Sequence, residues 1–167
     1  DPDAGSSPAI IHPGDGSVVD LGINTVNSQL FYTLNIKARN LKGDISLSVT
    51  DSHFSVSRSV LTKEEAEEGA NVELTCNLAD VLKYSGTLII TGGGLENAVS
   101  ISLKAQAVSG IPALPATDIT SESFLARWIH LPSIKEITLH VYTRDEDKIL
   151  LLDGYPRQCL SEDQEAR

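Results

Sequence analysis

The residues of this chain best suited to chemistry are its histidines, its cysteines, a run of glycines and two clusters of acids. The four histidines are His12, His53, His130 and His140. Zinc sites that can be recognised from sequence usually place histidines at a short fixed spacing, as in H-E-x-x-H. No two of these histidines have such a spacing, so the sequence does not predict a zinc site.

The chain contains two cysteines, Cys76 and Cys159. A catalytic thiol needs a neighbouring base or positive charge that lowers its pKa. No histidine lies near Cys76 in the sequence, and the alternation of NVELTCN places Cys76 on the same face as Val72 and Leu74. We therefore predict that Cys76 packs in a core as a small apolar side chain. The two cysteines fall in different parts of the chain, so we predict no disulfide between them.

The three glycines Gly92–Gly94 have the composition of a phosphate-binding loop. Such a loop precedes a helix, because the N–H groups at the helix N-terminus bind the phosphate. Here the glycines lie between two segments that alternate like strands, which favours a hairpin turn.

The acidic clusters lie at residues 61–69, LTKEEAEEG, and at Asp145–Asp147. A calcium loop needs carboxylates at a fixed spacing, with a glycine and a distal glutamate, and neither cluster has them. We interpret both as solvated charged surfaces, with weak calcium binding by Asp145, Glu146 and Asp147 as the alternative. No G-x-S-x-G serine and no paired carboxylates in a recognisable cleft are present. The sequence thus predicts no catalytic, cofactor-binding or metal-binding residue.

The elements that would position these residues are strands. In the stretch Leu30–Val49, the side chains of Leu30, Tyr32, Leu34, Ile36 and Ala38 share one face, which is the period of two of a half-buried strand. Alternation resumes at Ile45 after the turn residues 40–44, so we predict an antiparallel hairpin. Thr62 and Glu65 match a capping box and predict one helical turn in residues 61–69.

Further alternating segments give about seven short strands in about 100 residues, the pattern of a β-sandwich. Small residues and prolines at 109–112 mark a boundary. We therefore predict two domains, 1–108 and 109–167, in an all-β chain. In the second, only three strands can be drawn, within 123–129, 137–141 and 149–152, and the final stretch PRQCLSEDQEAR shows no period.

Composition limits the function. With 41% hydrophobic residues the chain can build a core, and its formal net charge of -10 disfavours nucleic acid and anionic lipid as partners. No apolar run reaches the ~20 residues that span a bilayer, so we predict no membrane insertion. The chain has no methionine, which predicts a processed or excised piece. Its polar start, DPDAGSSP, looks like a spacer after a removed leader or a lipid anchor.

Two parts of the chain resemble known families. The run NLKGDISLSVTDSHFSVSRSVLTKEEAEEGANVELTCN, with YSGTLIITGGG and VSISLKAQA, resembles an immunoglobulin-like module of exported multidomain proteins from Bacteroidetes-type bacteria, over residues 10–108. The run PALPATDITSESFLARW, followed by ITLHVY, resembles the start of a fibronectin type III domain, over about 112–155. In that resemblance Trp128 matches the core tryptophan.

The second resemblance implies a truncated sandwich, because the later strands of a fibronectin type III domain are absent. Such a half sandwich would leave Phe124, Trp128, Leu139 and Val141 without an opposing sheet. We expect this part to pack on the first domain, to associate with a second copy, or to be poorly ordered.

These observations predict a non-catalytic module of a secreted or cell-surface bacterial protein, acting as a spacer or as a protein-interaction domain. Its partners would be a protein or a glycan at the cell surface, with no cofactor. Phe31, Ile89 and Tyr142 are apolar residues expected on outer faces, and they mark a candidate interaction surface. The alternatives are a carbohydrate-binding module and an accessory module attached to an enzyme outside these residues.

Overall fold

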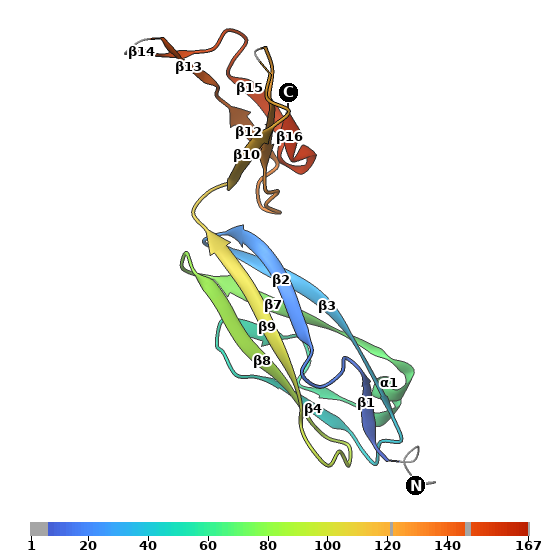
Figure 1. Cartoon of the computed structure of the whole chain (residues 1–167). Coiled ribbons are helices and arrows are strands. Elements are labelled where there is room, and N and C mark those ends of the chain that lie inside the picture. The colour runs from blue at the N-terminus through green and yellow to red at the C-terminus, as the bar shows by residue number, and fades with distance from the viewer. Residues whose placement is uncertain (1–6, 121, 146–147, 167) are drawn as a thin grey trace. The chain divides into compact units, whose positions relative to one another are not determined.

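The computed structural model describes residues 7–120, 122–145 and 148–166. The chain divides into two compact units, residues 1–107 and 108–167, which we call the N-terminal unit and the C-terminal unit (Figure 1). Almost all regular structure is strand, which confirms the predicted all-β class.

The N-terminal unit is a sandwich of two antiparallel sheets. One sheet has the strand order β1-β3-β7-β5 and the other the order β2-β9-β8-β4-β6. The elements are β1 (Ala9–His12), β2 (Val18–Thr25), β3 (Ser28–Arg39), β4 (Ile45–Val49), β5 (Phe54–Val56), β6 (Val60–Leu61), α1 (Lys63–Glu68), β7 (Ala70–Leu78), β8 (Lys83–Gly92) and β9 (Val99–Val108).

The core between the sheets is made by the alternation read from the sequence. Along β3, Leu34, Ile36 and Ala38 are buried while the residues between them are exposed. The second sheet supplies Leu88, Ile90, Ile101 and Leu103, each fully buried. Tyr32 departs from the prediction, since it falls in the inward-facing series but is 39% exposed.

The predicted hairpin between β3 and β4 is wrong. Strand β3 pairs with β7, from Ser28 opposite Leu78 to Ile36 opposite Ala70, whereas β4 pairs with β8 in the other sheet. The connecting residues 40–44 therefore cross between the sheets instead of closing a hairpin.

Leu41 gives the physical reason for this crossing. It is the one large apolar residue in the connection, and its side chain is buried in the core at 2% exposure. Two hydrogen bonds from backbone N–H groups hold the crossing in place: the Leu41 N–H donates to the Glu67 side chain at Oε1 (2.8 Å) and the Lys42 N–H donates to the Gly93 carbonyl (2.8 Å). A hairpin turn would leave Leu41 in water.

The predicted helical turn is confirmed as α1, with the capping box at Thr62. The Glu65 N–H donates to Thr62 Oγ1, and the Thr62 N–H donates to Glu65 Oε2 (3.0 Å). The Arg58 guanidinium donates to both carboxylate oxygens of Glu65, at 2.9 and 2.8 Å. Hydrogen bonds from Arg58 and then from the Thr62 backbone lower the pKa of Glu65 from its ordinary 4.5 to about 2.

This arrangement predicts a loss of stability in acid. A carboxyl whose pKa is lower in the folded state stabilises the fold above its unfolded pKa, and this contribution is lost as the pH falls through the folded pKa. For Glu65 the window runs from 4.5 down to about 2. We expect the melting temperature of the wild type to fall more steeply across this window than that of Glu65→Gln. Parallel curves for the two proteins would contradict this prediction.

The C-terminal unit consists of short strands in three small sheets, with orders β10-β11-β16, β12-β15 and β13-β14. Its elements are β10 (Ala113–Thr117), β11 (Leu125–Trp128), β12 (Glu136–Leu139), β13 (Tyr142–Asp145), β14 (Lys148–Leu151), β15 (Arg157–Leu160), the 3-10 helix η1 (Ser161–Asp163) and β16 (Glu165–Ala166).

The prediction of only three strands in this unit is wrong, because the polar stretch PRQCLSEDQEAR forms β15, η1 and β16. This stretch covers Trp128, which is 3% exposed. The Trp128 Nε1 donates to the Ser161 carbonyl (2.9 Å) and the Trp128 N–H to the Gln164 carbonyl (3.1 Å). Trp128 is therefore buried, contrary to the expectation, whereas Phe124, Leu139 and Val141 are only half-buried.

Candidate functional site

The arrangement closest to catalytic machinery lies after β4, at Asp51 and His53. Asp51 Oδ1 accepts hydrogen bonds from the His53 N–H (2.8 Å) and contacts His53 Nδ1 (2.9 Å). The hydrogen bonds from the backbone and then the side chain of His53 lower the pKa of Asp51. The His53 ring packs against Tyr84, with 4.8 Å between ring centroids. An aspartate that holds a histidine in this way is one part of a nucleophilic site.

The nucleophile that such a pair would need is not activated. Cys76 lies opposite Phe54 in the sheet and its thiol is fully buried. Burial, and then the negative charge of Asp51, raise the pKa of the Cys76 thiol to about 11. A reactive cysteine shows the opposite shift. The predicted packing role of Cys76 is confirmed, while the Asp51–His53 pair is a feature that the sequence analysis missed.

The raised pKa gives a prediction for thiol chemistry. In the folded protein at pH 8, Cys76 should resist a thiol-alkylating reagent, because the thiol is both buried and protonated. The half-buried Cys159 of β15 should be alkylated faster. Mass spectrometry of the labelled peptides measures both rates, and urea should remove the difference. Equal rates in the native protein would contradict the burial of Cys76.

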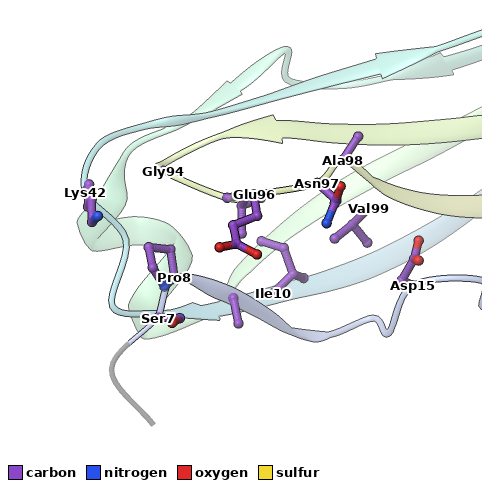
Figure 2. Close-up of a pocket in the computed structure, with 12 residues that line it drawn as sticks. Ser7, Pro8, Ile10, Asp15, Lys42, Gly94, Glu96, Asn97, Ala98 and Val99 are labelled. Carbon is purple, nitrogen blue, oxygen red and sulfur yellow. The ribbon is translucent and has the colours of Figure 1, made fainter. Parts of the chain in front are cut away.

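A pocket of about 370 Å³ opens in the N-terminal unit between β1 and the β8–β9 turn (Figure 2). Its charged residues are Asp15, Lys42 and Glu96, and neither histidine nor cysteine lines it. Asp15 Oδ1 accepts the Ser100 N–H (2.8 Å), so this carboxylate holds the beginning of β9 in place. Residues of β1 and of the β8–β9 turn form most of its wall, and no base lies beside a nucleophile among the described residues that line it.

The histidines do not gather into a metal site. His130 Nδ1 contacts Ser161 Oγ (3.0 Å), and the His140 ring stacks on Tyr142 with 6.3 Å between centroids. Across residues 7–120, 122–145 and 148–166, no group of three histidine, cysteine or acidic side chains is placed to hold a metal ion. Glu146 and Asp147 of the predicted acidic loop lie outside the described residues.

Two of the residues predicted as an interaction surface, Phe31 and Ile89, lie on the outer faces of different sheets. Phe31 is 57% exposed on the outer face of β3, and Ile89 is half-buried on the outer face of β8, which belongs to the other sheet. Tyr142 is 58% exposed and lies in β13 of the C-terminal unit. Phe31 and Ile89 therefore cannot form one continuous surface.

The surroundings of Phe31 were not foreseen from the sequence. Around it, β3 and β7 present opposed pairs of polar side chains. Gln29 donates to Asn77, and Asn35 Nδ2 donates to Asn71 Oδ1 (3.0 Å). The outward residues, which we call the amide face, are Gln29, Phe31, Thr33 and Asn35 of β3 and Asn71, Glu73, Thr75 and Asn77 of β7. The sequence feature that could have indicated the amide face is the set of polar residues at every second position of β3 and β7.

Comparison with known proteins places the fold. No protein-family model and no curated protein sequence matches the chain. The PapD-like domain 7 of human CEP192 is 11% identical over 63% of this chain and 87% of that chain, with a TM-score of 0.51. A family 123 glycoside hydrolase from Clostridium perfringens is 10% identical over 56% of this chain, with a TM-score of 0.49. This chain spans 23% of the length of that hydrolase chain.

The fold is thus a β-sandwich of the immunoglobulin-like and PapD-like kind, which confirms the predicted fold class. At this level of identity the likeness concerns the fold alone, and function has to be argued from the residues. Among the described residues, no helix is both long and apolar enough to cross a membrane.

Proposed function

We propose that this chain is a non-catalytic structural module of a secreted or cell-surface bacterial protein, acting as a spacer or as a protein-interaction domain. The observation that supports it most is the closed core of the N-terminal unit, where both sheets contribute fully buried apolar side chains. Three of its carboxylates are occupied at the surface, because Asp51 contacts His53, Glu65 accepts from Arg58, and Asp15 accepts the Ser100 N–H.

The bacterial source and the export rest on the sequence resemblance to modules of exported Bacteroidetes-type proteins. The resemblance of the C-terminal unit to the start of a fibronectin type III domain belongs to the same proposal. Tandem sandwiches of this kind hold neighbouring domains apart, since each is a rigid body with loops free for contact.

Stretching the chain in a single-molecule force experiment tests the spacer role. The N-terminal unit should unfold in one step, because one continuous core joins its two sheets. The extended chain of this unit measures roughly 350 Å, at about 3.5 Å per residue over about 100 residues, and the step should equal that length minus the end-to-end distance of the folded unit. A gradual extension at low force, without a step of that length, would show a domain too soft to act as a spacer.

A second candidate function is carbohydrate binding, which the amide face favours. Exposed aromatic rings stack on sugar rings, and amide groups offer both donors and acceptors to hydroxyls. Phe31 lies between the two amide pairs along β3, and opposite Thr75. Retention on insoluble polysaccharide that is lost in Phe31→Ala, but kept in the control Val18→Ala, would favour this function. Equal behaviour of both variants would exclude the amide face as the sugar site.

A further inference from the structure

Part of one edge of the sheet β1-β3-β7-β5 has no neighbouring strand. Strand β3 pairs with β7 from Ser28 to Ile36, whereas on its other side β1 pairs only with the end of β3, from Lys37 to Arg39. Among the described residues, no strand lies along β3 before Lys37 on that side. We call residues 31–35, FYTLN, the open edge.

The hydrogen bonds of β7 determine which backbone groups of the open edge point to the free side. In an antiparallel pair, the N–H and C=O of one residue point to the same neighbour, and successive residues alternate. The Glu73 carbonyl accepts the Ser57 N–H beside β5 (2.9 Å), so the next residue, Leu74, points to β3. Because Leu74 lies opposite Tyr32, the backbone of Tyr32 bonds to β7, and the residues on either side of Tyr32 point away from β7.

Phe31, Thr33 and Asn35 thus turn three N–H and three C=O groups toward the free side. No hydrogen bond to these backbone groups occurs within the part of the chain that the structure describes. Natural sheet edges are commonly protected by charged residues, proline, bulges or short strands. Residues 28–36, SQLFYTLNI, are uncharged, lack proline and pair with β7 in unbroken register. The open edge therefore keeps the capacity to bind another strand.

The open edge is closed at both ends. At one end, the Gln29 carbonyl accepts a hydrogen bond from Asn24 Nδ2 (3.2 Å). At the other end, Lys37 is paired with His12 of β1. Strand β3 of a second copy, with 12 residues, is longer than this gap and would run into one of these two ends. The gap therefore fits a short extended segment and not a long strand.

The exposure of Tyr32 indicates the chemistry of that segment. Tyr32 belongs to the inward-facing series between Leu30 and Leu34, which are 5% and 3% exposed, yet the exposed fraction of Tyr32 is 39%. An added strand would place every second side chain on the same face as Tyr32. Apolar side chains at these positions would cover the ring and remove apolar surface from water.

We propose that the open edge binds a short extended peptide of a partner protein by strand addition, with apolar side chains at every second position of the peptide. Both neighbours of β3 are antiparallel to it, and we assign the same direction to the peptide. About five residues would span the gap and bond to the three N–H and three C=O groups. This inference rests on the proposed role in protein interaction and names the kind of partner, whereas the spacer role does not depend on it.

Amide hydrogen exchange of the whole chain, followed by nuclear magnetic resonance, tests the open edge first. In the free protein, the amides of Phe31, Thr33 and Asn35 should exchange fast. Those of Tyr32 and Leu34 should be protected, because they bond to β7. Slow exchange of the first three amides in the free protein would overturn the proposal, since the edge would then already be occupied.

A peptide titration tests the binding. The probe is a capped pentapeptide of alternating threonine and valine that begins and ends with threonine, so that its valines lie on the face of Tyr32. At a peptide concentration of about ten times Kd, the amides of Phe31, Thr33 and Asn35 should exchange about tenfold more slowly, because about a tenth of the protein is then free. A probe that does not protect these amides at millimolar concentration would overturn the proposal.

Matched variants of the peptide and of the protein test the geometry. The peptide methylated at its threonine nitrogens should not bind, because these nitrogens face β3, whereas the peptide methylated at its valine nitrogens should bind. Thr33→Pro removes one edge N–H and should weaken binding by about tenfold or more. It should still fold, as circular dichroism would show, because proline is accepted where a strand N–H is unpaired. Thr33→Val is the control and should bind like the wild type, since the backbone is recognised.

Equal binding of both methylated peptides, or of Thr33→Pro and the wild type, would contradict strand addition. The failure of this inference can be told apart from a failure of the spacer role. A protein that binds no peptide but unfolds under force in one step would lose the peptide site and keep the spacer role. A protein that binds the peptide but extends gradually would show the reverse.

Discussion

Leu88→Ala is expected to destabilise the N-terminal unit by about 3–4 kcal/mol, the cost of deleting a fully enclosed leucine side chain. Leu88 is fully buried in β8, between Val49 of β4 and Ile101 of β9. Domains of this size are stable by about 5–15 kcal/mol in total, so this change removes a large part of the margin. Urea unfolding followed by far-ultraviolet circular dichroism measures this loss of stability. The midpoint of the unfolding curve should shift to lower urea concentration while the slope of the free energy against urea stays constant.

Ile89→Ala is the matched control for this prediction. It removes a side chain of the same size from the next residue of the same strand, but Ile89 is on the outer face and half-buried. The expected cost is about 1 kcal/mol or less, as for most surface substitutions. Equal costs at positions 88 and 89 would show that the two faces of β8 do not alternate between core and solvent.

Gly93→Ala is expected to cost about 3 kcal/mol, because both the backbone and the packing at this position require glycine. Gly93 has a φ of 60°, a region in which a side chain is strained. An added Cβ would lie 2.9 Å from Ile45 Cγ2, 2.9 Å from Leu41 Cδ2 and 3.2 Å from the Gly43 carbonyl. Overpacking of this kind costs about 1–3 kcal/mol, in addition to the backbone strain.

Gly43→Ala serves as the control, since Gly43 lies in the crossing that Gly93 contacts. A Cβ at Gly43 would meet nothing within 4 Å. The urea midpoint of unfolding of Gly43→Ala should therefore match that of the wild type. If Gly43→Ala destabilised the unit as much as Gly93→Ala, the packing of the crossing against the β8–β9 turn would be contradicted.

The parts of the fold that sequence predicts well are those determined by neighbouring residues. Alternation locates β3, β7, β8 and β9, because each has one face in the core. The capping box at Thr62 and the turn at Gly92–Gly94 depend on side chains within a few residues. In these segments the local preference of the residues agrees with the final fold, so the sequence pattern alone is sufficient to predict the element.

The wrong predictions concern segments whose structure is determined by residues far away in the sequence. The turn residues 40–44 suit a hairpin, but burial of Leu41 and the Lys42 bond to Gly93 favour a crossing between sheets. The polar segment that forms β15 and β16 has no period, because its strands are held by pairing with β12 and β11. Neither contact can be read from the local sequence.

The candidate sites also divide into those that local sequence predicts and those that depend on distant contacts. Burial of Cys76 follows from alternation, and the Asp51–His53 pair is a local D-x-H contact that a search for nearby acid partners of each histidine would find. The amide face requires the register between β3 and β7, which pairs Gln29 with Asn77 across a large separation in the chain. A surface built from two strands becomes visible only when their pairing is known.

The most direct test of the account is a set of cross-strand proton contacts measured by nuclear magnetic resonance in solution. The two-sheet sandwich predicts contacts between Leu34 and Val72 in one sheet and between Leu47 and Ile90 in the other. It also predicts no strand pairing between β3 and β4. Contacts that pair Ala38 with Ile45 as neighbours in a hairpin would contradict the layered arrangement, and with it the closed core on which the proposed structural role depends.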